Sequence, residues 1–403
     1  MSTSLLYQAF GLKGYLYLRT EYRQGKTIFS IDQEDNRLRS SCCNSLQVIR
    51  RGFEVRSFRT VPIGSRPVEL VFPVPRVECL RCGAVRQVNL DFAEKRRSYT
   101  KQFERYALDL LRHMTIQDVA QHLRISWDVI KDLQKRSLQK RFGKPKLKRL
   151  QQIAIDEISI GKGHQYLTVV LDLHTGAVVF VGDGKGAEAL LPFWKRLRCA
   201  GAKIEAVAMD MSPAYIEAVA HNLKDALIVF DHFHVIKLFN DKLSNLRRDL
   251  YHEATDTQKE VLKGSRWLLL KNPENLEVKR NERQRLDDAL KLNLPLATAY
   301  YMKEELRLFW QQANLKQAAA FLDDWCARAK ASGVKMLAKF AKTLDRHRTG
   351  LLNYYQYPIT TAALEGTNNK IKTMKRQAYG FRDKEFLKLK ILGIHDTKYA
   401  LVG

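Results

Sequence analysis

The spacing of apolar residues changes along the chain. Up to about residue 90, short stretches alternate between apolar and polar positions, as at 53–56 and 68–72, and Gly and Pro bound them. Alternation of this kind predicts strands, here arranged as small β-hairpins. From residue 100 to 141 the apolar period becomes helical. Pro145, inside a basic run, then marks a linker to a larger domain.

The larger domain opens with three β-branched runs separated by glycine-containing turns, which predicts an antiparallel meander. Two further strands follow, each preceded by a helix. The expected strands are 153–156, 164–173, 177–181, 204–210 and 226–231, and the expected helices are 187–198 and one that starts near Pro213. With the helical sequence from 232 onward, the order βββαβαβα is that of a ribonuclease-H-like domain, a mixed sheet with helices on its faces.

Charge is the unusual quantity in the composition. Lys and Arg number 69 against 43 Asp and Glu, which gives a net charge of +26 and an isoelectric point near 9.8. Such a field attracts polyanions, because each phosphate that a cation neutralises releases condensed counterions. No stretch reaches about 18 consecutive apolar residues, which argues against a membrane span. Nucleic acid is the expected partner, and the lack of a basic signal-peptide start predicts a cytoplasmic protein.

Two acidic residues lie on predicted core strands. Asp156 lies among isoleucines, where a carboxylate must be paired or bound to a metal, and Asp210 ends a second strand. Adjacent strands lie about 4.8 Å apart, so carboxylates at equivalent heights could share one or two Mg²⁺ ions. Each acid taken alone is more often a solvated strand-end residue. Glu157 occupies the opposite face of the first strand, and the pattern does not choose between it and Asp156.

Glu365 begins a polar face on the predicted final helix. Asn368, Asn369 and Lys372 lie at i+3, i+4 and i+7 and share that face. Such a face is normally just solvated, but an acid with two amides and a base also suits a site for metal and phosphate. The residues that continue the face are Lys375, Arg376, Tyr379 and Phe381. They add charge and stacking surface for nucleic acid.

Asp231 and His234 follow the last predicted core strand. Asp231 could simply cap the next helix, and this interpretation is at least as good as a catalytic role. His234 lies three residues further on, would face the same side, and could contact a scissile phosphate or orient a carboxylate. We therefore place His234 beside the acids as a candidate catalytic residue in a supporting role.

Around Arg124 the pattern predicts two short helices joined by a turn, with Thr115 and Ser126 as their N-caps. This fits a helix-turn-helix whose second helix, 127–135, reads the major groove of DNA. The candidate DNA contacts on that helix are Trp127, Lys131 and Lys135. An ordinary helical hairpin would produce the same pattern, and the net charge of +26 favours the DNA-binding interpretation.

Four of the six cysteines cluster in the first quarter of the chain, which favours a metal site over disulfides. They are Cys42, Cys43, Cys79 and Cys82. Cys79 and Cys82 have the spacing of half a zinc knuckle, whose other half should be a second such pair. The chain offers adjacent cysteines instead, and neighbours rarely both ligate one tetrahedral ion, so the zinc site could be degraded. The residues expected to hold the hairpins by apolar packing in that case are Phe53, Val71 and Phe72.

Together these patterns predict an α/β protein with a ribonuclease-H-like core and a helical insertion. A small β-rich, zinc-finger-like domain and a helix-turn-helix precede the core. The expected divisions are 1–92 for the β-rich domain, 93–145 for the helix-turn-helix, 150–240 for the first part of the core, 241–355 for the helical insertion, and 356–403 for the final core helix with Glu365 and the basic C-terminus.

Stretches in order along nearly the whole chain resemble the ISL-three family of bacterial insertion-sequence transposases. They are IDEI at 155–158 with GHQYLT at 163–168, AMDMSPAY at 208–215, FDHFHVIK at 230–237 and LEGTNNKIK at 364–372. The resemblance implies an acid triad of Asp156, Asp210 and Glu365 on a ribonuclease-H-like fold, and it favours Asp156 over Glu157. It also implies an N-terminal zinc-binding domain and a helix-turn-helix that binds terminal inverted repeats. Ser40 departs from the family pattern, which places a cysteine there.

The resemblance also implies a chemistry, a DDE-type mechanism with Mg²⁺ or Mn²⁺ at the triad. Water attacks the phosphodiester at the end of the element, and the freed 3′-hydroxyl then attacks target DNA, without a covalent enzyme intermediate. The expected partners are double-stranded DNA, as terminal repeats and target, and further copies of the chain, as a homodimer or higher homo-oligomer in a synaptic complex at the bacterial nucleoid. Two rival functions are a nuclease or resolvase that hydrolyses without joining, and a non-catalytic DNA-binding regulator.

Overall fold

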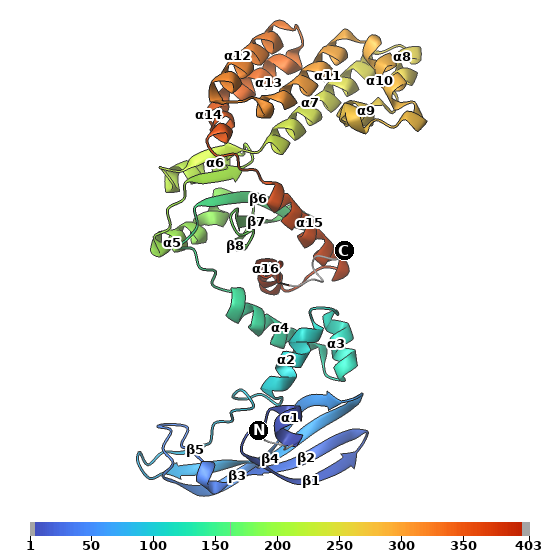
Figure 1. The fold of residues 1–403 in the computed structure, drawn as a ribbon. Coiled ribbons are helices and arrows are strands. Elements are labelled where there is room, and N and C mark those ends of the chain that lie inside the picture. Colours follow the sequence, from blue (N-terminus) through green and yellow to red (C-terminus); the bar gives the residue numbers. More distant parts are fainter. Residues whose placement is uncertain (1–4, 162, 397–403) are drawn as a thin grey trace. The chain divides into compact units, whose positions relative to one another are not determined.

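A computed structural model describes residues 5–161 and 163–396 of the chain (Figure 1). The chain forms two compact units. Of the described residues, the first contains 5–143, 374–389 and 395–396, and the second contains 144–161, 163–373 and 390–394. Among the described residues, no helix combines the length and the apolar composition that a membrane span requires.

The first unit begins with a five-stranded sheet. Its elements are α1 (Leu5–Phe10), β1 (Tyr15–Arg23), β2 (Lys26–Gln33), the 3₁₀ helix η1 (Asp35–Arg37), β3 (Val48–Ile63), β4 (Arg66–Cys79) and β5 (Val85–Gln87). The strand order is β1-β2-β4-β3, and β5 pairs with β4. β2 runs parallel to β4, whereas the other pairs are antiparallel.

β3 and β4 form one long hairpin where the sequence predicts small ones. β3 has 16 residues and β4 has 14, and their pairing register shifts at two places. Pro73 and Pro75 lie inside β4, and proline normally interrupts a strand because it has no N–H to donate. On the other side of β4, β2 pairs only with residues 68–71. The prolines lie beyond that partner, so β4 continues through them.

Aromatic residues form the core of this sheet. Phe58 and Phe72 are fully buried, and Phe92 packs edge to face against both rings. The expected packing around Phe72 is confirmed, whereas the same expectation for Phe53 is wrong, because Phe53 is 66% exposed. Phe53 precedes Phe58 by five positions and therefore faces the opposite side of the strand.

Three helices follow the sheet: α2 (Lys101–Leu110), α3 (Ile116–Leu123) and α4 (Trp127–Phe142). Thr115 begins α3 with a capping box, because its hydroxyl accepts from the Asp118 N–H at 3.2 Å and its N–H donates to the Asp118 carboxylate at 3.1 Å. Arg124 ends α3 with a left-handed backbone, φ 50°, and so makes the tight turn. Ser126 precedes α4 as predicted, although its side chain makes no capping hydrogen bond.

A second five-stranded sheet lies in the second unit. Its strands and the helices between them are β6 (Gln152–Gly161), β7 (Gln165–Asp172), β8 (Val178–Asp183), η2 (Ala187–Leu190), α5 (Leu191–Ala200), β9 (Ala206–Met209), α6 (Pro213–Asn222) and β10 (Leu227–Phe230). The strand order is β10-β9-β6-β7-β8. The antiparallel pairing of β6, β7 and β8 confirms the predicted meander. β9 runs parallel to β6, and β10 parallel to β9, so the sheet is mixed.

Helices make up the described chain between β10 and the final helices, as the sequence predicts. They are α7 (His232–Glu253), α8 (Asp256–Leu262), α9 (Ser265–Leu270), η3 (Pro273–Asn275), η4 (Val278–Arg280), α10 (Glu282–Lys291), α11 (Leu294–Leu306), η5 (Arg307–Gln311), α12 (Leu315–Ala331), α13 (Lys335–Arg346), α14 (Arg348–Leu352) and η6 (Asn353–Tyr355). The final helices are α15 (Ala362–Gln377) and α16 (Lys384–Leu392).

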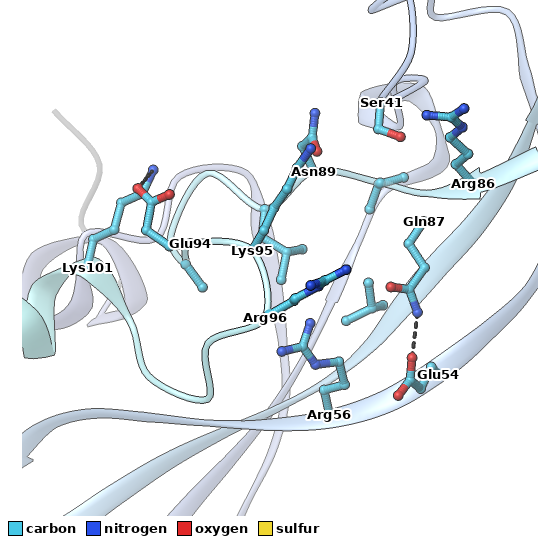
Figure 2. A pocket seen from close by; sticks show the side chains of 14 residues that line it. Ser41, Glu54, Arg56, Arg86, Gln87, Asn89, Glu94, Lys95, Arg96 and Lys101 are labelled. Carbon is cyan, nitrogen blue, oxygen red and sulfur yellow. Dashed lines mark hydrogen bonds and ion pairs between the residues drawn. The ribbon is translucent and has the colours of Figure 1, made fainter. Parts of the chain in front are cut away.

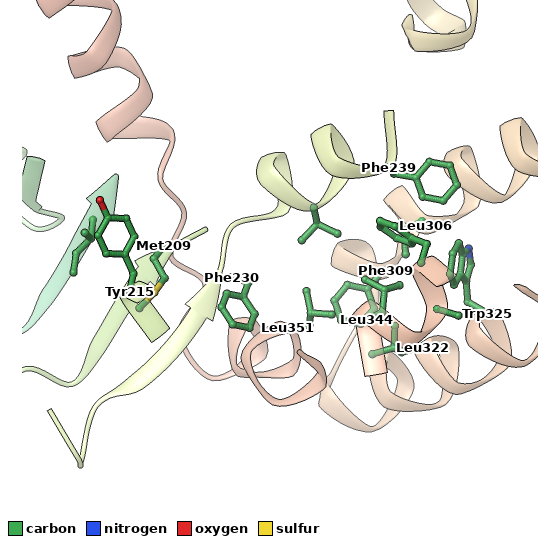
Figure 3. Packing of buried hydrophobic residues seen from close by; sticks show 14 of the residues in the cluster. Met209, Tyr215, Phe230, Phe239, Leu306, Phe309, Leu322, Trp325, Leu344 and Leu351 are labelled. Atoms are coloured by element: carbon green, nitrogen blue, oxygen red, sulfur yellow. The ribbon is translucent and has the colours of Figure 1, made fainter. Parts of the chain in front are cut away.

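The helical region has an aromatic core and is attached to the edge strand β10. Phe239 packs edge to face against Trp325, whose indole N–H donates to the Met302 carbonyl at 3.0 Å (Figure 3). The Asn353 amide donates to the Ile228 carbonyl of β10 at 2.8 Å. The helices that follow β10 therefore return to the same strand before α15 begins.

Candidate active site

Three acidic residues lie at one level of the second sheet. Asp156 lies on β6, Asp210 follows β9 and Asp231 follows β10. In the parallel register, Ala154 pairs with Ala208, so two residues further on Asp156 is level with Asp210. Met209 pairs with Phe230, which makes Asp210 level with Asp231. Because neighbouring strands lie about 4.8 Å apart, this register brings the three carboxylates together.

Helix α15 adds a fourth acid, Glu365, and two hydrogen bonds fix the start of this helix at the sheet. The Asn368 amide donates to Asp156 Oδ2 at 2.8 Å. The Thr361 N–H donates to Asp231 Oδ1 at 3.1 Å. Glu365 lies in the first turn of the helix, between these two anchors, and its N–H donates to the Thr361 carbonyl at 2.8 Å.

The environment of Asp156 disfavours its charged form. Burial raises the pKa of Asp156, and the carboxylates of Asp210 and Glu365 raise it further, whereas His234 lowers it. Burial and then the charge of Asp231 also raise the pKa of Glu365, and His234 again opposes them. The acids thus share one electrostatic environment, in which negative charge is concentrated; His234 offsets it at both Asp156 and Glu365, and Lys237 and His232 also act on Glu365.

Glu157 is also close to this site. Burial, then the charges of Asp210 and Asp156, raises the pKa of Glu157. Asp156 differs from it in two contacts, because Asp156 receives the Asn368 amide from α15 and interacts with Glu365. These contacts favour Asp156 over Glu157 as the partner of the acid on α15.

Hydrogen bonds hold the side chains of Asp210 and Tyr215 in place. Asp210 Oδ1 accepts from the Ser212 N–H at 3.0 Å, which fixes the carboxylate at the turn into α6. Tyr215 on α6 is fully buried, and its hydroxyl bonds to Thr168 Oγ1 at 2.9 Å. Burial raises the pKa of Tyr215, with Asp210 and other nearby acids contributing, so the phenol stays neutral beside them.

Asp231 does not cap the next helix, the simpler role considered for it. It precedes α7 without a side-chain cap hydrogen bond, and it is 1% exposed. Its Oδ1 instead accepts from Thr361, 130 residues further along the chain. The sequence placed Asn368 on the polar face of Glu365 but did not predict its contact with Asp156. Asp231 and Asn368 position α15, and neither contact is local in sequence.

Several buried polar atoms around the acids lack a hydrogen-bond partner among the described residues. They are Asp231 Oδ2, His234 Nε2 and Asn368 Oδ1. Buried polar atoms normally have partners, so these atoms suit a site that takes up ions, water or a polar substrate. Carboxylate and amide oxygens are also the ligands that Mg²⁺ and Mn²⁺ prefer. The chemistry of these residues therefore fits a divalent metal. Among the described residues, however, the carboxylate oxygens of Asp156, Asp210 and Glu365 do not all lie within 4.8 Å of one another.

That close grouping occurs instead among cysteines of the first unit. Cys43 Sγ lies 3.4 Å from Cys79 Sγ and 3.8 Å from Cys82 Sγ, and all three sulfurs lie within 4.8 Å of one another. A tetrahedral zinc site with Zn–S bonds of about 2.3 Å has sulfurs about 3.8 Å apart, so the three thiols fit zinc. Cys42, included among the candidate ligands, is exposed and lies outside this group.

Ser40 contacts the cysteine group. It is buried, its Oγ accepts from the Cys42 N–H at 3.3 Å, and its side chain acts to lower the pKa of Cys79. Burial acts to raise the pKa of Cys79, but the backbone N–H groups of Cys82 and Arg81, with the Cys43 and Ser40 side chains, lower it to about 6. Ser40, where the resemblance implies a cysteine, therefore has an electrostatic influence on Cys79.

The predicted DNA contacts on α4 have partners within the protein. Lys131 and Lys135 lie 3.2 Å and 2.9 Å from the Asp383 carboxylate. Lys131 also lies over the ring of Trp127, which is 42% exposed. A DNA phosphate bound by either lysine would therefore compete with Asp383 for it.

The candidate DNA contacts on α15 differ in exposure. Asn369, Lys372 and Arg376 are exposed, and Lys375 is partly buried. Burial lowers the pKa of Lys375. Asn369 and Lys372 were expected to share the face of Glu365, but the buried member of that set is Asn368, which contacts Asp156.

Acids at one level of neighbouring parallel strands, in a basic chain that also carries a helix-turn-helix, define an enzyme that acts on DNA, and comparison with known proteins agrees. Residues 153–391 match the profile of a transposase family, and residues 88–137 match the helix-turn-helix domain of transposase family ISL3. The chain belongs to the ISL-three (ISL3) family of transposases. The resemblance noted in the sequence is confirmed.

Two relatives are named as transposases of insertion sequence elements. The transposase for insertion sequence element IS1001 from Bordetella parapertussis is 34% identical over 84% of this chain and 84% of its own length. The transposase for insertion sequence element IS1557 from Mycobacterium tuberculosis is 27% identical over 84% of this chain and 81% of its own length. Among solved structures, a Drosophila P element transposase strand transfer complex matches 66% of this chain and 81% of its own, at 12% identity and a TM-score of 0.35.

Proposed function

We propose that the protein is the DNA transposase of an insertion sequence, which cleaves DNA at the ends of the element and joins them to target DNA. Asp156, Asp210 and Glu365 form the catalytic triad. The observation that carries this proposal is the hydrogen bond from Asn368 to Asp156, because it fixes the helix of Glu365 against the strands of the other two acids. The sheet order, with an antiparallel meander followed by two parallel strands, supports a ribonuclease-H-like core.

The triad would hold Mg²⁺ or Mn²⁺ ions, which stabilise the charge that develops on the attacking and leaving oxygens of a phosphoryl transfer. The chain's own residues have separate tasks. Asn368 orients Asp156, and Asp231 holds the start of α15 through Thr361. His234 lies among the acids and offsets their negative charge. Its unpartnered Nε2 is the group we assign to contact the scissile phosphate or its water.

The reaction would be two transfers in sequence. In the first, the oxygen of water bonds to the phosphorus at the end of the element and the P–O3′ bond breaks, which leaves a 3′-hydroxyl. In the second, this hydroxyl attacks a phosphodiester of target DNA, and the target's own 3′-oxygen leaves with a proton. Each transfer exchanges one bond to phosphorus for another, so no covalent enzyme intermediate is required.

The helix-turn-helix would recognise the terminal inverted repeats, with α4 in the major groove. Trp127, Lys131 and Lys135 are the proposed contacts on this helix, and the net charge of +26 supports binding to DNA phosphates. On α15, Asn369, Lys372, Lys375 and Arg376 are the proposed DNA contacts. Because two ends of an element must meet before joining, we also propose a homodimer or higher homo-oligomer as the active assembly.

The proposed zinc site uses Cys43, Cys79 and Cys82, with Ser40 at the fourth position. Three sulfurs 3.4 and 3.8 Å apart and a buried hydroxyl beside Cys79 support it. Zinc here would be structural, because it links the chain before β3 to the end of β4.

A cleavage and joining assay tests the proposal. Purified protein is incubated with Mg²⁺ or Mn²⁺, labelled DNA carrying the element's ends, and target plasmid, and the products are sequenced. The proposal predicts cuts at the element's ends and joined products. Cuts without joining would identify a nuclease or resolvase, and binding without cuts would identify a regulator.

Isosteric variants assign the residues in the same assay. Asp156→Asn, Asp210→Asn and Glu365→Gln should each reduce cleavage by more than the ~10- to 100-fold that loss of an outer-shell partner costs, with end binding retained. Glu157→Gln is the matched control, because Glu157 lies beside the triad without the contact to α15. Near wild-type cleavage by any triad variant would remove that residue from the triad.

A further inference from the structure

The first unit contains a basic pocket that no part of the proposed mechanism uses. It has a volume of about 630 Å³ and is lined by β3, β4 and β5 on one side and by the segment 88–101, which leads into α2, on the other. Figure 2 shows long polar side chains from both sides around it. The cationic residues that line it are Arg56, Arg86, Lys95, Arg96 and Lys101.

The positive charge of this pocket is only partly neutralised by the protein. Its two carboxylates, Glu54 and Glu94, already have partners: Glu54 accepts from the Gln87 amide at 2.5 Å, and Glu94 lies 3.7 Å from Lys101. In the described part of the chain, the side chains of the remaining exposed cations make no ion pair or hydrogen bond. They are Arg86, Lys95 and Arg96.

Like charges gathered around one pocket repel each other, and an anion bound among them offsets that repulsion. Arginine presents a planar fork of N–H donors that fits the oxygens of a phosphate, and lysine adds a point charge. Arg96 also has a left-handed backbone, φ 60°, which a residue with a side chain rarely adopts unless its surroundings hold it there. The Arg97 N–H bond to the Glu94 carbonyl, at 3.2 Å, closes that turn and so supports the backbone that presents Arg96.

Contacts within the first unit attach the pocket to the helix-turn-helix. Arg97, next to the pocket residue Arg96, forms an ion pair with Asp132 of α4 at 3.1 Å. Arg59 on β3 donates to the Leu123 carbonyl at the end of α3 at 2.8 Å. The pocket therefore lies beside the helices that would bind a DNA duplex. The phosphates of that duplex are the anions that we expect to reach the pocket.

We propose that this pocket binds the phosphodiester backbone of duplex DNA, on the flank of the sequence that α4 reads. The inference rests on the proposed function, because it takes the helix-turn-helix to be a DNA reader. The pocket would fix the orientation of the β-rich sheet on the duplex. It would add affinity that does not depend on base sequence, because phosphate contacts carry no base information.

The test compares two triple variants of the full chain. The pocket variant is Arg86→Gln, Lys95→Gln and Arg96→Gln. The control is Lys13→Gln, Arg39→Gln and Arg66→Gln, which removes the same charge from exposed cations of the same sheet region that do not line the pocket. Exposure of all six side chains favours normal folding, which thermal melting checks.

Each protein is titrated with two duplexes across a range of salt. One is the shortest duplex that retains sequence-specific binding, and the other extends it by about 10 base pairs, one helical turn, on each side. For the long duplex, the pocket variant should lose up to about three units of salt slope, at roughly 0.9 per phosphate contact, whereas the control should keep its slope. For the short duplex, the pocket variant and the control should bind alike.

Equal binding of the long duplex by the two variants would overturn the pocket proposal. So would an equal loss by the pocket variant on both duplexes, because the contact would then not lie on the flank. Weaker binding of inorganic phosphate by the pocket variant, with unchanged duplex binding, would assign the pocket to a small anion and likewise overturn it. Failure of the proposed function gives a different result, in which the wild-type chain binds the end duplex no better than an unrelated one.

Discussion

At the scale of single residues, the surroundings of Asp156 favour its neutral form, whereas the metal-binding role that we propose for it requires the charged form. Burial and two neighbouring carboxylates raise the pKa of Asp156. The Asn368 amide and the Glu157 N–H, both at 2.8 Å, hold its oxygens in place despite that repulsion. A carboxylate kept in such surroundings costs stability, and a divalent cation would restore it.

The first prediction therefore concerns stability without metal. A group whose pKa is raised by folding stabilises the protein below its unfolded pKa, and that contribution is lost as pH rises through the folded pKa. At pH 7 in a chelator, Asp156→Asn should therefore unfold at higher denaturant than wild type. With Mg²⁺ the order should reverse, because only wild type gains the free energy of ion binding. Equilibrium unfolding measures both, and a variant less stable than wild type in chelator would contradict the prediction.

How far the sequence predicts this site depends on how local each contact is. Asp156 and Asp210 could be found because strand ends and β-branched runs are local patterns. Glu365 could be placed on a polar helix face, but the pattern alone could not bring that helix to the sheet. The bond from Thr361 to Asp231 joins residues 130 positions apart, and no periodicity encodes such a pair.

At the scale of elements, the proposed DNA contacts of α4 already have a partner within the protein. Its N-terminal turn and the capping box of α3 were predictable from residues three or four positions apart. The partner of Lys131 and Lys135 was not, because Asp383 lies 248 residues beyond Lys135. Only the folded chain shows that these two cations are already paired.

The second prediction follows from that pairing. Asp383→Asn should free Lys131 and Lys135 for phosphates, and so raise DNA affinity and increase the salt slope by about one for each phosphate that a freed lysine binds. Hydrogen bonding from Lys135, then from the Phe386 N–H, lowers the pKa of Asp383 to about 2. Because this pKa is depressed, the stabilisation is present above the unfolded value of about 3.9 and declines only as pH falls toward 2. The effect of the variant should therefore be constant from pH 5 to 8, as salt-dependent binding curves can check, and an unchanged affinity would show that these lysines do not contact DNA.

The third prediction concerns the junction between α14 and β10. A Cβ added at Gly350 would lie 2.3 Å from the Phe230 ring, which is buried. Gly350→Ala should therefore cost about 1–3 kcal/mol through overpacking. Gly366→Ala is the control, because its Cβ would meet nothing within 4 Å, and it should stabilise helix α15 by up to about 1 kcal/mol. Urea unfolding measures the stability of both variants against wild type. If Gly350→Ala were as stable as Gly366→Ala, β10 would have to move away from α14 without cost, which would contradict the prediction.

At the scale of the whole molecule, the sequence predicted the order of the core elements better than the N-terminal sheet. The meander, β9 and β10 follow strong β-branched runs, and each was expected near its observed place. The β3–β4 hairpin is longer than predicted. The sequence pattern ended the second strand at Pro73 and Pro75, but β4 continues through both prolines. β4 can contain these prolines because β2 pairs only with residues 68–71, and the extent of that pairing is a property of the assembled sheet.

The fourth prediction concerns the proposed zinc site beside this sheet. The protein should bind about one zinc per chain, and Cys79→Ser should release it and lower the melting temperature. Ser40→Cys should tighten binding, because it supplies a fourth thiolate beside Cys79. Cys42→Ser should change neither quantity, since Cys42 lies outside the group. Metal analysis after chelator treatment measures occupancy, and well under one zinc per chain in wild type would show that the site has decayed.

The central claim is that Asp156, Asp210 and Glu365 act by holding metal ions, and a change of metal preference tests it most directly. Sulfur is a poor ligand for Mg²⁺ and a better one for Mn²⁺. Asp156→Cys, Asp210→Cys and Glu365→Cys should therefore lose cleavage of the element's ends in Mg²⁺ and regain part of it in Mn²⁺. Glu157→Cys should keep the wild-type ratio of the two rates. An unchanged Mn²⁺-to-Mg²⁺ ratio in all three triad variants, or a changed ratio in Glu157→Cys alone, would contradict the account.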